Sequence, residues 1–589
     1  MKKISAFLLL AALSSASLNA QSYHTVYPSG FSGYSNYFYS IAPVENIPAT
    51  PLGYISAGET RTSSGPMYRY PCVIRTDKNG LLTQPVNFKR LYILFDLTGT
   101  YRQGYAVGAF PMIDGQTVVV GNYYDLSGGN IEGIYWQLLN ADGSVAGTTF
   151  YKYTFRGQAV KVIQSAYGGN LYVCGQSYDP FHNSSRVSVM NIDPWGNLLW
   201  SKMYDIGGNS PTDNDEAVGI CELPHGPTGN VELVVAGKSY FNDPVRGQVA
   251  RIFAQRMNPA DGSLHAAPVL YDALADNMFR VEHIQAVTDA SFGVGVLFTG
   301  AFIRNSGIQS EAWAMLTDNS ISNVLWTNYY VPASSSSMYE INRASAQLTD
   351  VSGNNYFALC GNNTTVAGSW NGHVIKVDLN GNPAASAWNN YGGAWDEVFA
   401  SATHAAGSTT TMAMAGNSQI GTDIHGWIAH TNSSLAVPCS YLTDNCSAGK
   451  ADYVKTTAMY SDKDDAVKQN ASSWPVDWFV PYPVCYSAVR LADVAVEADD
   501  MIAENNNSVF SIFPNPASNQ IAVNIDKLDE NAKLIITDIS GREVLSHQIS
   551  SSETEQTIRI DFDGLLAKGL YTVTLQTSIK TKTELLIIQ

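Results

Sequence analysis

The chain has 589 residues and a formal net charge of −17, from 34 Lys and Arg against 51 Asp and Glu. Only 14% of the residues are charged, whereas 45% are hydrophobic and 11% aromatic, and this balance excludes an intrinsically disordered chain. An acidic chain without a stripe of Lys and Arg is not expected to bind nucleic acid.

The first 20 residues contain the three parts of a secretory signal peptide. Met1 to Lys3 supply a positive region, residues 7–13 an apolar region, and residues 18–20 a cleavage site. The apolar region is too short to cross a bilayer core of about 30 Å. No later segment has the roughly 18 consecutive apolar residues of a spanning helix. We therefore expect a cleaved signal peptide over residues 1–20 and no transmembrane segment.

One pattern recurs seven times between residues 22 and 440. A short apolar run ends in glycine at positions 58, 121, 175, 237, 300, 361 and 416, at spacings of 63, 54, 62, 63, 61 and 55 residues. A turn rich in Asp, Asn and Gly follows each run, and an aromatic strand such as Trp200–Tyr204 usually comes next. Each unit holds four short strands and no helical pattern. The repeat predicts an all-β fold, a seven-bladed β-propeller of four-stranded blades, in preference to a solenoid with its shorter coils.

The start of the mature chain resembles the last strand of a unit. Residues 23–27, Tyr-His-Thr-Val-Tyr, have the aromatic pattern of a fourth strand without three strands before them. We expect them to pair into the last blade and close the ring, which would remove two exposed sheet edges. Residues 434–441 compete for the same place.

The segment from Asn390 to Gly416 carries a family resemblance. Its Asn-Tyr-Gly-Gly-Ala-Trp-Asp-Glu start and its terminal glycine resemble the unit of secreted Bacteroidetes-type propellers, and the resemblance spans residues 22–440. It implies a fold and not an activity.

Residues 441–508 lose the period. They include an Asp-Lys-Asp-Asp run at 462–465, which lacks the ligand spacing of a calcium loop, and an Asn-rich stretch at 499–507. We expect an irregular connector that ends in an exposed linker.

Residues 509–589 contain seven short alternating strands, which predicts a small immunoglobulin-like β-sandwich. Four motifs resemble the type A C-terminal sorting domain of the type IX (Por) secretion system: FPNPASN at 513–519, DISGREV at 538–544, LAKGLYTV at 566–573 and KTKTELLIIQ at 580–589. The motif residues carried over are Pro514, Asn515, Pro516, Gly541, Gly569 and Tyr571. The resemblance implies Sec export, passage across the outer membrane, and removal of this domain at the cell surface. The implied partners are the type IX machinery and its surface peptidase.

The sequence contains no linear catalytic or metal-binding motif. HExxH, GxSxG, Walker and CxxC patterns are absent, so no catalytic residue, metal or cofactor is predicted. The seven cysteines leave at least one thiol unpaired, and their pairing stays open. Cys174 and Cys360 occupy the same place in two units, where we expect small buried side chains.

Alternating antiparallel strands bring two sets of loops to one face: those between the second and third strands, and those that lead into the next unit. These loops vary while the scaffold repeats, so we expect them to carry function. Their candidate binding residues are Tyr178, Phe181, His182, Tyr240, Phe241, Trp370 and Trp395. The alternative is that these aromatic residues pack between blades. Acidic residues at the start of the first strands, such as Asp215 and Glu216, are a candidate cation site.

The sequence thus predicts a secreted or cell-surface propeller that binds a glycan or a protein without enzymatic activity. The alternatives are a surface lyase or hydrolase that uses the same loops, and a structural protein of the envelope or matrix.

Overall fold

The computed structural model divides into two compact units, residues 1–487 and 488–589. It describes residues 23–486 and 510–588 except the segments 28–33, 47–49, 63–67, 83–86, 96–99, 113, 126–129, 154–155, 180–182, 207–213, 225, 227–229, 244–246, 274–276, 305–308, 333–338, 351, 365–369, 392–395, 407–408, 421–422, 432–434, 436–439, 445, 451–452, 458–459, 465, 477–481, 514–519, 526–529, 539–542, 553, 555, 563–568 and 578–580. The predicted signal peptide and the Asn-rich linker lie outside the described residues. Within the described part there is no helix of the length and apolarity needed to cross a membrane.

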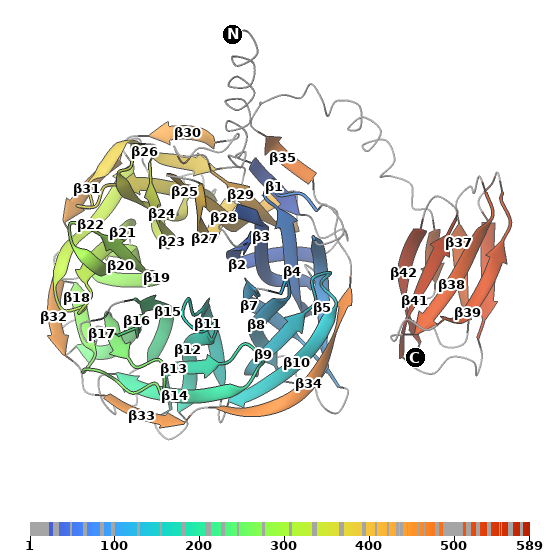
Figure 1. The fold of residues 1–589 in the computed structure, drawn as a ribbon, viewed down its shortest axis with the longest axis horizontal. Helices are drawn as coiled ribbons and strands as arrows, with labels where there is room; N and C mark the ends of the chain where they lie inside the picture. Colours follow the sequence, from blue (N-terminus) through green and yellow to red (C-terminus); the bar gives the residue numbers. More distant parts are fainter. Residues whose placement is uncertain are drawn as a thin grey trace, which may run out of the picture. The chain divides into compact units, whose positions relative to one another are not determined.

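The first unit is a ring of seven antiparallel blades, which confirms the predicted β-propeller (Figure 1). Each blade has four strands, taken from the centre outward. Blade 1 is β2 (Tyr34–Asn46), β3 (Thr50–Thr62), β4 (Arg69–Asp77) and β5 (Phe88–Phe95), with the short β6 (Tyr101–Arg102) beside it; blade 2 is β7 (Gly104–Pro111), β8 (Thr117–Tyr124), β9 (Ile131–Leu139) and β10 (Val145–Tyr153); blade 3 is β11 (Gly157–Gln164), β12 (Leu171–Asp179), β13 (Ser184–Ile192) and β14 (Leu198–Ile206); blade 4 is β15 (Asp215–Leu223), β16 (Glu232–Asp243), β17 (Gly247–Met257) and β18 (Val269–Ala273); blade 5 is β19 (Met278–Asp289), β20 (Gly293–Arg304), β21 (Gln309–Asp318) and β22 (Val324–Pro332); blade 6 is β23 (Tyr339–Thr349), β24 (Asn355–Thr364), β25 (Trp370–Val377) and β26 (Pro383–Tyr391); blade 7 is β27 (Asp396–Ala406), β28 (Thr409–Ile420), β29 (Asp423–His430) and β1 (Tyr23–Tyr27).

The repeated glycine has a steric cause. In every blade the pairing of the first and second strands skips one residue of the first strand, a β-bulge, immediately beside the glycine. A Cβ atom at Gly175 would lie 1.9 Å from the carbonyl oxygen of Gln158, and one at Gly58 would lie 1.8 Å from that of Tyr37. The bulge brings the backbone so close that only glycine fits.

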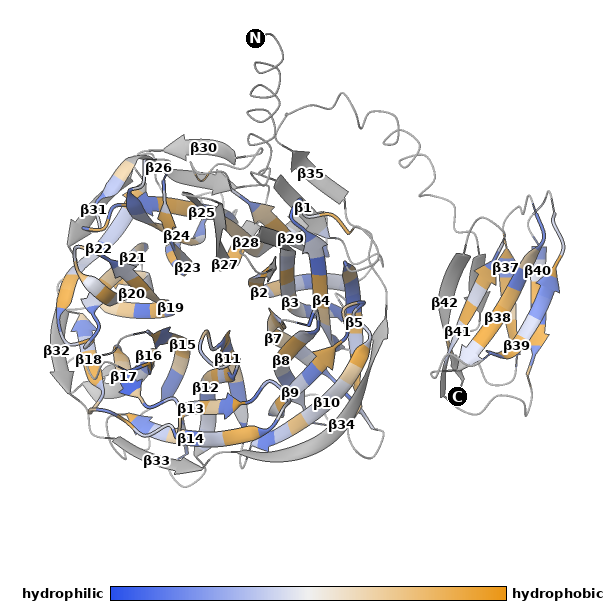
Figure 2. Cartoon of the chain, in the orientation of Figure 1, coloured by the Kyte–Doolittle hydropathy of each residue, from blue (hydrophilic) through white to orange (hydrophobic). Residues whose placement is uncertain are grey.

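The hydrophobic core is divided among the blade interfaces. Seven clusters of buried residues each join two neighbouring blades, and the last of them joins blade 7 to blade 1. Figure 2 shows hydrophobic residues on blades all round the ring. Cys72, Cys174, Cys221 and Cys360 are free and buried, and burial raises the pKa of the Cys174 thiol to about 12. The expectation for Cys174 and Cys360 is confirmed.

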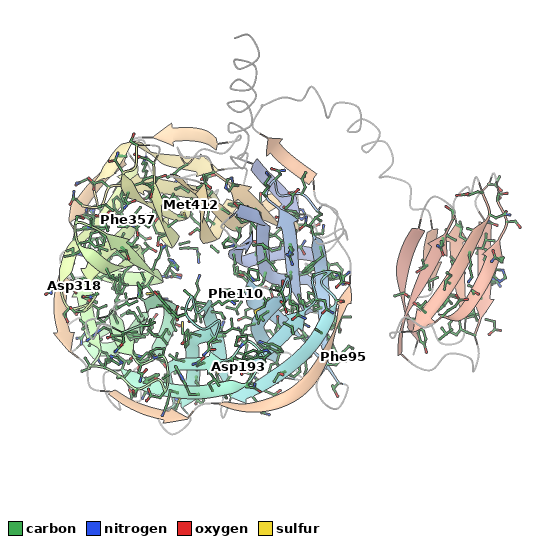
Figure 3. All side chains as sticks on the ribbon, in the orientation of Figure 1. Phe95, Phe110, Asp193, Asp318, Phe357 and Met412 are labelled. Carbon is green, nitrogen blue, oxygen red and sulfur yellow. The ribbon has the colours of Figure 1, made fainter. Side chains whose placement is uncertain are left out.

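In six of the seven blades, a described tyrosine of the outer strand bonds to the next blade. Asp193 and Asp318, labelled in Figure 3, begin two of the turns between the third and fourth strands. The residue in the left-handed conformation of such a turn presents its carbonyl oxygen to the tyrosine hydroxyl of the preceding blade. The described pairs are Tyr27 with Gly80, Tyr92 with Gly143, Tyr151 with Gly196, Tyr204 with Gly262, Tyr271 with Ile321, and Tyr330 with Gly381.

The N-terminal strand closes the ring. β1 pairs antiparallel with β29 over all five of its residues, from Tyr23 opposite His430 to Tyr27 opposite Gly426. Tyr27 is fully buried, and its hydroxyl donates to the Gly80 carbonyl oxygen at 2.7 Å. The predicted closure is therefore confirmed, and residues 440–441 lie instead in a strand on blade 6.

A belt of further strands runs round the outside of the ring (Figure 1). We use "belt" for β30 (Ser440–Asp444), β31 (Cys446–Lys450), β32 (Tyr453–Thr457), β33 (Tyr460–Asp464), β34 (Ala466–Val476) and β35 (Tyr482–Tyr486). They pair in turn with the fourth strands of blades 6, 5, 4 and 3, then with blades 2 and 1 through β34, and finally with β1 of blade 7. The belt thus visits the blades in the reverse of their order in the sequence.

The belt corrects the prediction of an irregular connector for residues 441–486, whereas residues 487–508 lie outside the described residues. The Asp-Lys-Asp-Asp run contributes Asp462 to Asp464 to the ladder with β14. Single strands that pair with an existing edge need no repeat of their own, so the loss of the period does not reveal them.

The second unit has seven strands in two sheets. One sheet has the order β36 (Phe510–Phe513), β37 (Gln520–Ile525) and β40 (Gln556–Asp561); the other has the order β39 (Glu543–Ile549), β38 (Ala532–Asp538), β41 (Gly569–Gln576) and β42 (Thr581–Ile588). One cluster of buried residues contains side chains from both sheets, among them Val523 and Val573. This is the predicted small sandwich.

Candidate functional site

The candidate site is a cavity of about 330 Å³ formed by the first strands of the blades. Its lining comes from blades 1 to 6 and comprises Tyr39, Arg69, Tyr105, Val107, Gln158, Ala159, Val160, Lys161, Val218, Glu282 and Arg343. Six of these are the bulged residues themselves: Tyr39, Val107, Val160, Val218, Glu282 and Arg343. The bulge that requires glycine in the second strand therefore also supplies the lining of this channel cavity.

The blade 1 side of the cavity is a network of tyrosine, arginine and glutamate. The Tyr39 hydroxyl donates to Glu59 Oε1 at 2.7 Å. The Glu59 side chain is 1% exposed, and its oxygens lie 3.7 Å from Arg61 and 3.5 Å from Arg69. The Arg61 guanidinium lies 4.0 Å from the centre of the Tyr37 ring. Burial, with the Glu59 charge, raises the pKa of Tyr39 well above its usual value, so its phenol stays a donor.

Blades 1, 2 and 3 are joined across the cavity by aromatic and amide contacts. The rings of Tyr39 and Tyr105 meet edge to face with centroids 6.1 Å apart. Gln158 Nε2 donates to the Tyr105 hydroxyl at 2.8 Å. Both tyrosines are thus held in place before any ligand binds.

The opposite side is centred on Glu282 of β19, which interacts with cations from three blades. Its carboxylate lies 3.8 Å from Lys238 Nζ and 3.9 Å from Arg343, and Arg280 donates to it. Lys238 also pairs with Glu216 at 3.0 Å. Glu282 is therefore engaged by neighbouring cations.

Lys161 lies beside the bulge of β11. Its ladder partner is Cys174, and no carboxylate of the described residues lies within ion-pair distance of its amine. Burial lowers the pKa of Lys161 from its usual value. The nearby His283 has a buried Nδ1 without a hydrogen-bond partner, and burial together with the Lys161 charge holds the pKa of His283 well below its usual value. The imidazole is therefore neutral and adds no second positive charge beside the ammonium.

The acidic residues at the start of the first strands are neutralised by side chains. Arg186 lies 3.6 Å from Asp215 and 3.4 Å from Asp205, and all three are buried. Burial raises the pKa of Asp215 to about 7. The backbone N–H of Ile206 donates to the carboxylate and acts in the opposite direction, but its effect is smaller. The described residues contain no group of three His, Cys, Asp or Glu side chains able to hold a metal ion.

The predicted loop aromatics form no single described site. Tyr178 donates to Asn183 Oδ1 at 2.6 Å, and Tyr240 is half-buried at the end of β16. The side chains of Phe241 and Trp370, and all of Phe181, His182 and Trp395, lie outside the described residues. The binding role of this set stays a prediction.

The channel residues escaped prediction because nothing in the sequence marks them. The bulged residue precedes the repeated glycine by 14 residues in blade 2, from Val107 to Gly121, but by 19 in blade 1, from Tyr39 to Gly58. The first strand and its turn vary in length between blades, so counting back from the glycine does not locate the bulge.

In the second unit, Gly569 begins β41 and Tyr571 is buried in it. Pro514, Asn515, Pro516 and Gly541, the other residues of the sorting motifs, lie outside the described residues.

Comparison with known proteins gives a match along most of the chain and another at its C-terminal domain. No curated protein matches the sequence. A solved structure with which the chain shares 10% identity is that of PorZ from Porphyromonas gingivalis, titled an essential bacterial surface component of the type IX secretion system; the match covers 94% of this chain and 81% of that chain, at a TM-score of 0.22. The family model for the secretion system C-terminal sorting domain matches residues 511–589. Those residues are a type IX sorting domain, and the chain that carries them is exported across the outer membrane to the surface or the medium.

Proposed function

We propose that the exported propeller is a saccharide-binding module, with the ligand held in the channel cavity and contacted by the surrounding loops. The observation that carries this proposal is the pair Tyr39 and Tyr105, fixed by hydrogen bonds beside a preformed cavity. Aromatic rings with convergent polar groups suit the apolar faces and hydroxyls of sugars.

The size of the cavity favours a saccharide over a folded protein. A volume of about 330 Å³ accommodates one or two sugar rings. A stable protein partner needs about 800 Å² of surface on each side, which a concave cavity of this size does not offer. A protein ligand is the second candidate only for the loops around the cavity.

The charges favour binding over turnover. Glycoside hydrolysis needs two carboxyl groups that flank the bond, whereas Glu282 is the one carboxylate among the described lining residues, and it is ion-paired. We further propose that the signal peptide of residues 1–20 directs Sec export and that the surface peptidase of the type IX system removes the sorting domain.

The test is a glycan array probed with the purified full chain and two variants. Val160 is 37% exposed in the cavity, so Val160→Trp should fill the cavity and abolish binding without loss of core packing. Leu199 is 51% exposed on the outer strand β14, and Leu199→Trp is the matched control that should bind as the parent does. Binding that survives Val160→Trp would refute the channel as the site. Turnover of a glycan that Val160→Trp abolishes would establish the enzyme alternative.

A further inference from the structure

We propose that the saccharide held in the channel carries an anionic group, which the Lys161 ammonium receives. This inference rests on the proposed saccharide binding and adds the charge class of the ligand. It follows from the charges of the lining, from the lack of a partner for Lys161, and from the place of Lys161 in the repeat.

The cavity is cationic in a strongly acidic protein. Its described lining contains Arg69, Lys161 and Arg343 against the single carboxylate of Glu282, whereas the whole chain has a net charge of −17. A cavity with low-dielectric walls and one sign of charge concentrates the opposite ion. The lining therefore carries a net positive charge, which favours an anionic group over a neutral one inside the cavity.

The other lining cations already have carboxylate neighbours. Arg69 lies 3.5 Å from Glu59, and Arg343 lies 3.9 Å from Glu282. Lys161 has no such neighbour among the described residues. Its ladder partner Cys174 supplies no counter-charge, because burial raises the pKa of that thiol to about 12. A buried ammonium without a counter-charge is unfavourable, so an arriving anion gains more at Lys161 than at either arginine.

The scaffold does not require a lysine at this position. The residues that directly follow the bulge in blades 1 to 7 are Ser40, Gly108, Lys161, Gly219, His283, Ala344 and Ala400. Five of the seven are small, and Lys161 is the one that carries a full positive charge. The bulge forms equally well without it, so its charge serves a purpose other than folding.

The anionic group can be a carboxylate, a sulfate or a phosphate on a sugar ring. All three present oxygen acceptors to an ammonium and to the nearby guanidinium groups. The test therefore includes an arm for each: oligogalacturonate, a sulfated oligosaccharide and a phosphorylated one, each with a neutral counterpart such as the methyl ester of the uronate.

The experiment is calorimetric titration of the full chain with these pairs at low salt. We expect at least one acidic member to bind about tenfold or more tightly than its neutral counterpart, in line with one charge-assisted contact. Lys161→Met should remove that preference, and Lys161→Arg should retain it. Lys152→Met, which removes a 47% exposed lysine of β10, is the matched control and should change nothing.

Two results would overturn the inference. One is equal affinity for the acidic and neutral members; the other is a preference for the acidic member that persists in Lys161→Met. Neutral saccharides that bind and lose affinity in Val160→Trp would leave the proposed function intact while the inference fails. If no saccharide binds, both fail. The folding of Lys161→Met is checked independently: because the change removes a buried charge without a partner, the variant should melt no lower than the parent.

Discussion

Replacement of Gly175 by alanine tests the origin of the repeated glycine. The new Cβ atom would lie 1.9 Å from the Gln158 carbonyl oxygen, where contacts under 3.0 Å are essentially never seen, so the two strands must separate by at least about 1.1 Å. The carbonyl oxygen belongs to the backbone and the backbone fixes the position of Cβ, so neither atom can rotate away. The bulge must therefore flatten or the ladder between β11 and β12 must open.

The expected cost follows from the contacts that this movement breaks. Two backbone hydrogen bonds at about 0.5–1.5 kcal/mol each, with about 1–3 kcal/mol of overpacking, give about 2–6 kcal/mol of lost stability. At about 2.1 cal/mol/K of unfolding entropy per residue, for a ring of roughly 450 residues, this corresponds to a fall in Tm of about 2–6 °C.

The assay is thermal unfolding of the full chain beside Gly147→Ala. Gly147 lies in β10, and a Cβ atom there would meet nothing within 4 Å. That control should leave the Tm unchanged or raise it slightly through the reduced entropy of the unfolded chain. Equal Tm values for the two variants would refute the steric explanation. The Gly175→Ala variant should also lose ligand affinity, because Val160 and Lys161 line the cavity from the same bulge.

Four further results are expected. Tyr27→Phe should lower the free energy of unfolding by about 1–3 kcal/mol, because a buried carbonyl oxygen loses its donor. Tyr151→Phe should lower it by the same amount. If urea unfolding shows no loss for Tyr27→Phe while Tyr151→Phe loses stability, the bond from Tyr27 does not stabilise the seam between blades 7 and 1. A chain without residues 488–589 should remain a folded, monomeric propeller but fail to reach the surface, and its display on intact cells would contradict the sorting assignment. Further removal of the belt, residues 440–486, should expose blade edges and cause aggregation seen by light scattering; a monodisperse product would show that the belt is dispensable. Since the pKa of Asp215 is raised to about 7, its contribution to stability is largest near pH 4 and declines as the pH rises to about 7. Asp215→Asn should therefore make the Tm less dependent on pH between about 4 and 7. If the dependence of Tm on pH is the same in the variant and the parent, other groups cause it.

The blades were predictable because their determinants are local and repeated. The glycine beside the bulge recurs in every second strand, and a left-handed turn glycine follows the third strand in blades 1, 2, 3, 4 and 6, so both recur in the sequence at the period of the fold. In blade 5, Ile321 takes the place of the turn glycine with a φ of 54°, a conformation that is strained for a residue with a side chain. The turn is held there by its contacts, which include the hydrogen bond from Tyr271 to the Ile321 carbonyl oxygen.

The belt and the channel cavity were not predictable for different reasons. The belt is held by main-chain pairing to edges that already exist, which leaves no period in its own residues. The cavity brings together residues as distant as Tyr39 and Arg343, and each stands at a bulge whose place depends on the length of its own strand. Its chemistry emerges only when the ring closes.

The reverse course of the belt gives blade 7 a mechanical role. The strand β1 lies between β29 and β35, so this one sheet holds the start of the folded ring and its final strand. Any pulling force applied through the C-terminal residues during export enters the ring at β35 and passes directly to β1. The hydrogen bonds of this ladder would share a pull along the strands, whereas a pull across the strands would open them one at a time. The strand β1 thereby anchors β35, and the belt cannot be completed until the chain has been made as far as Tyr486.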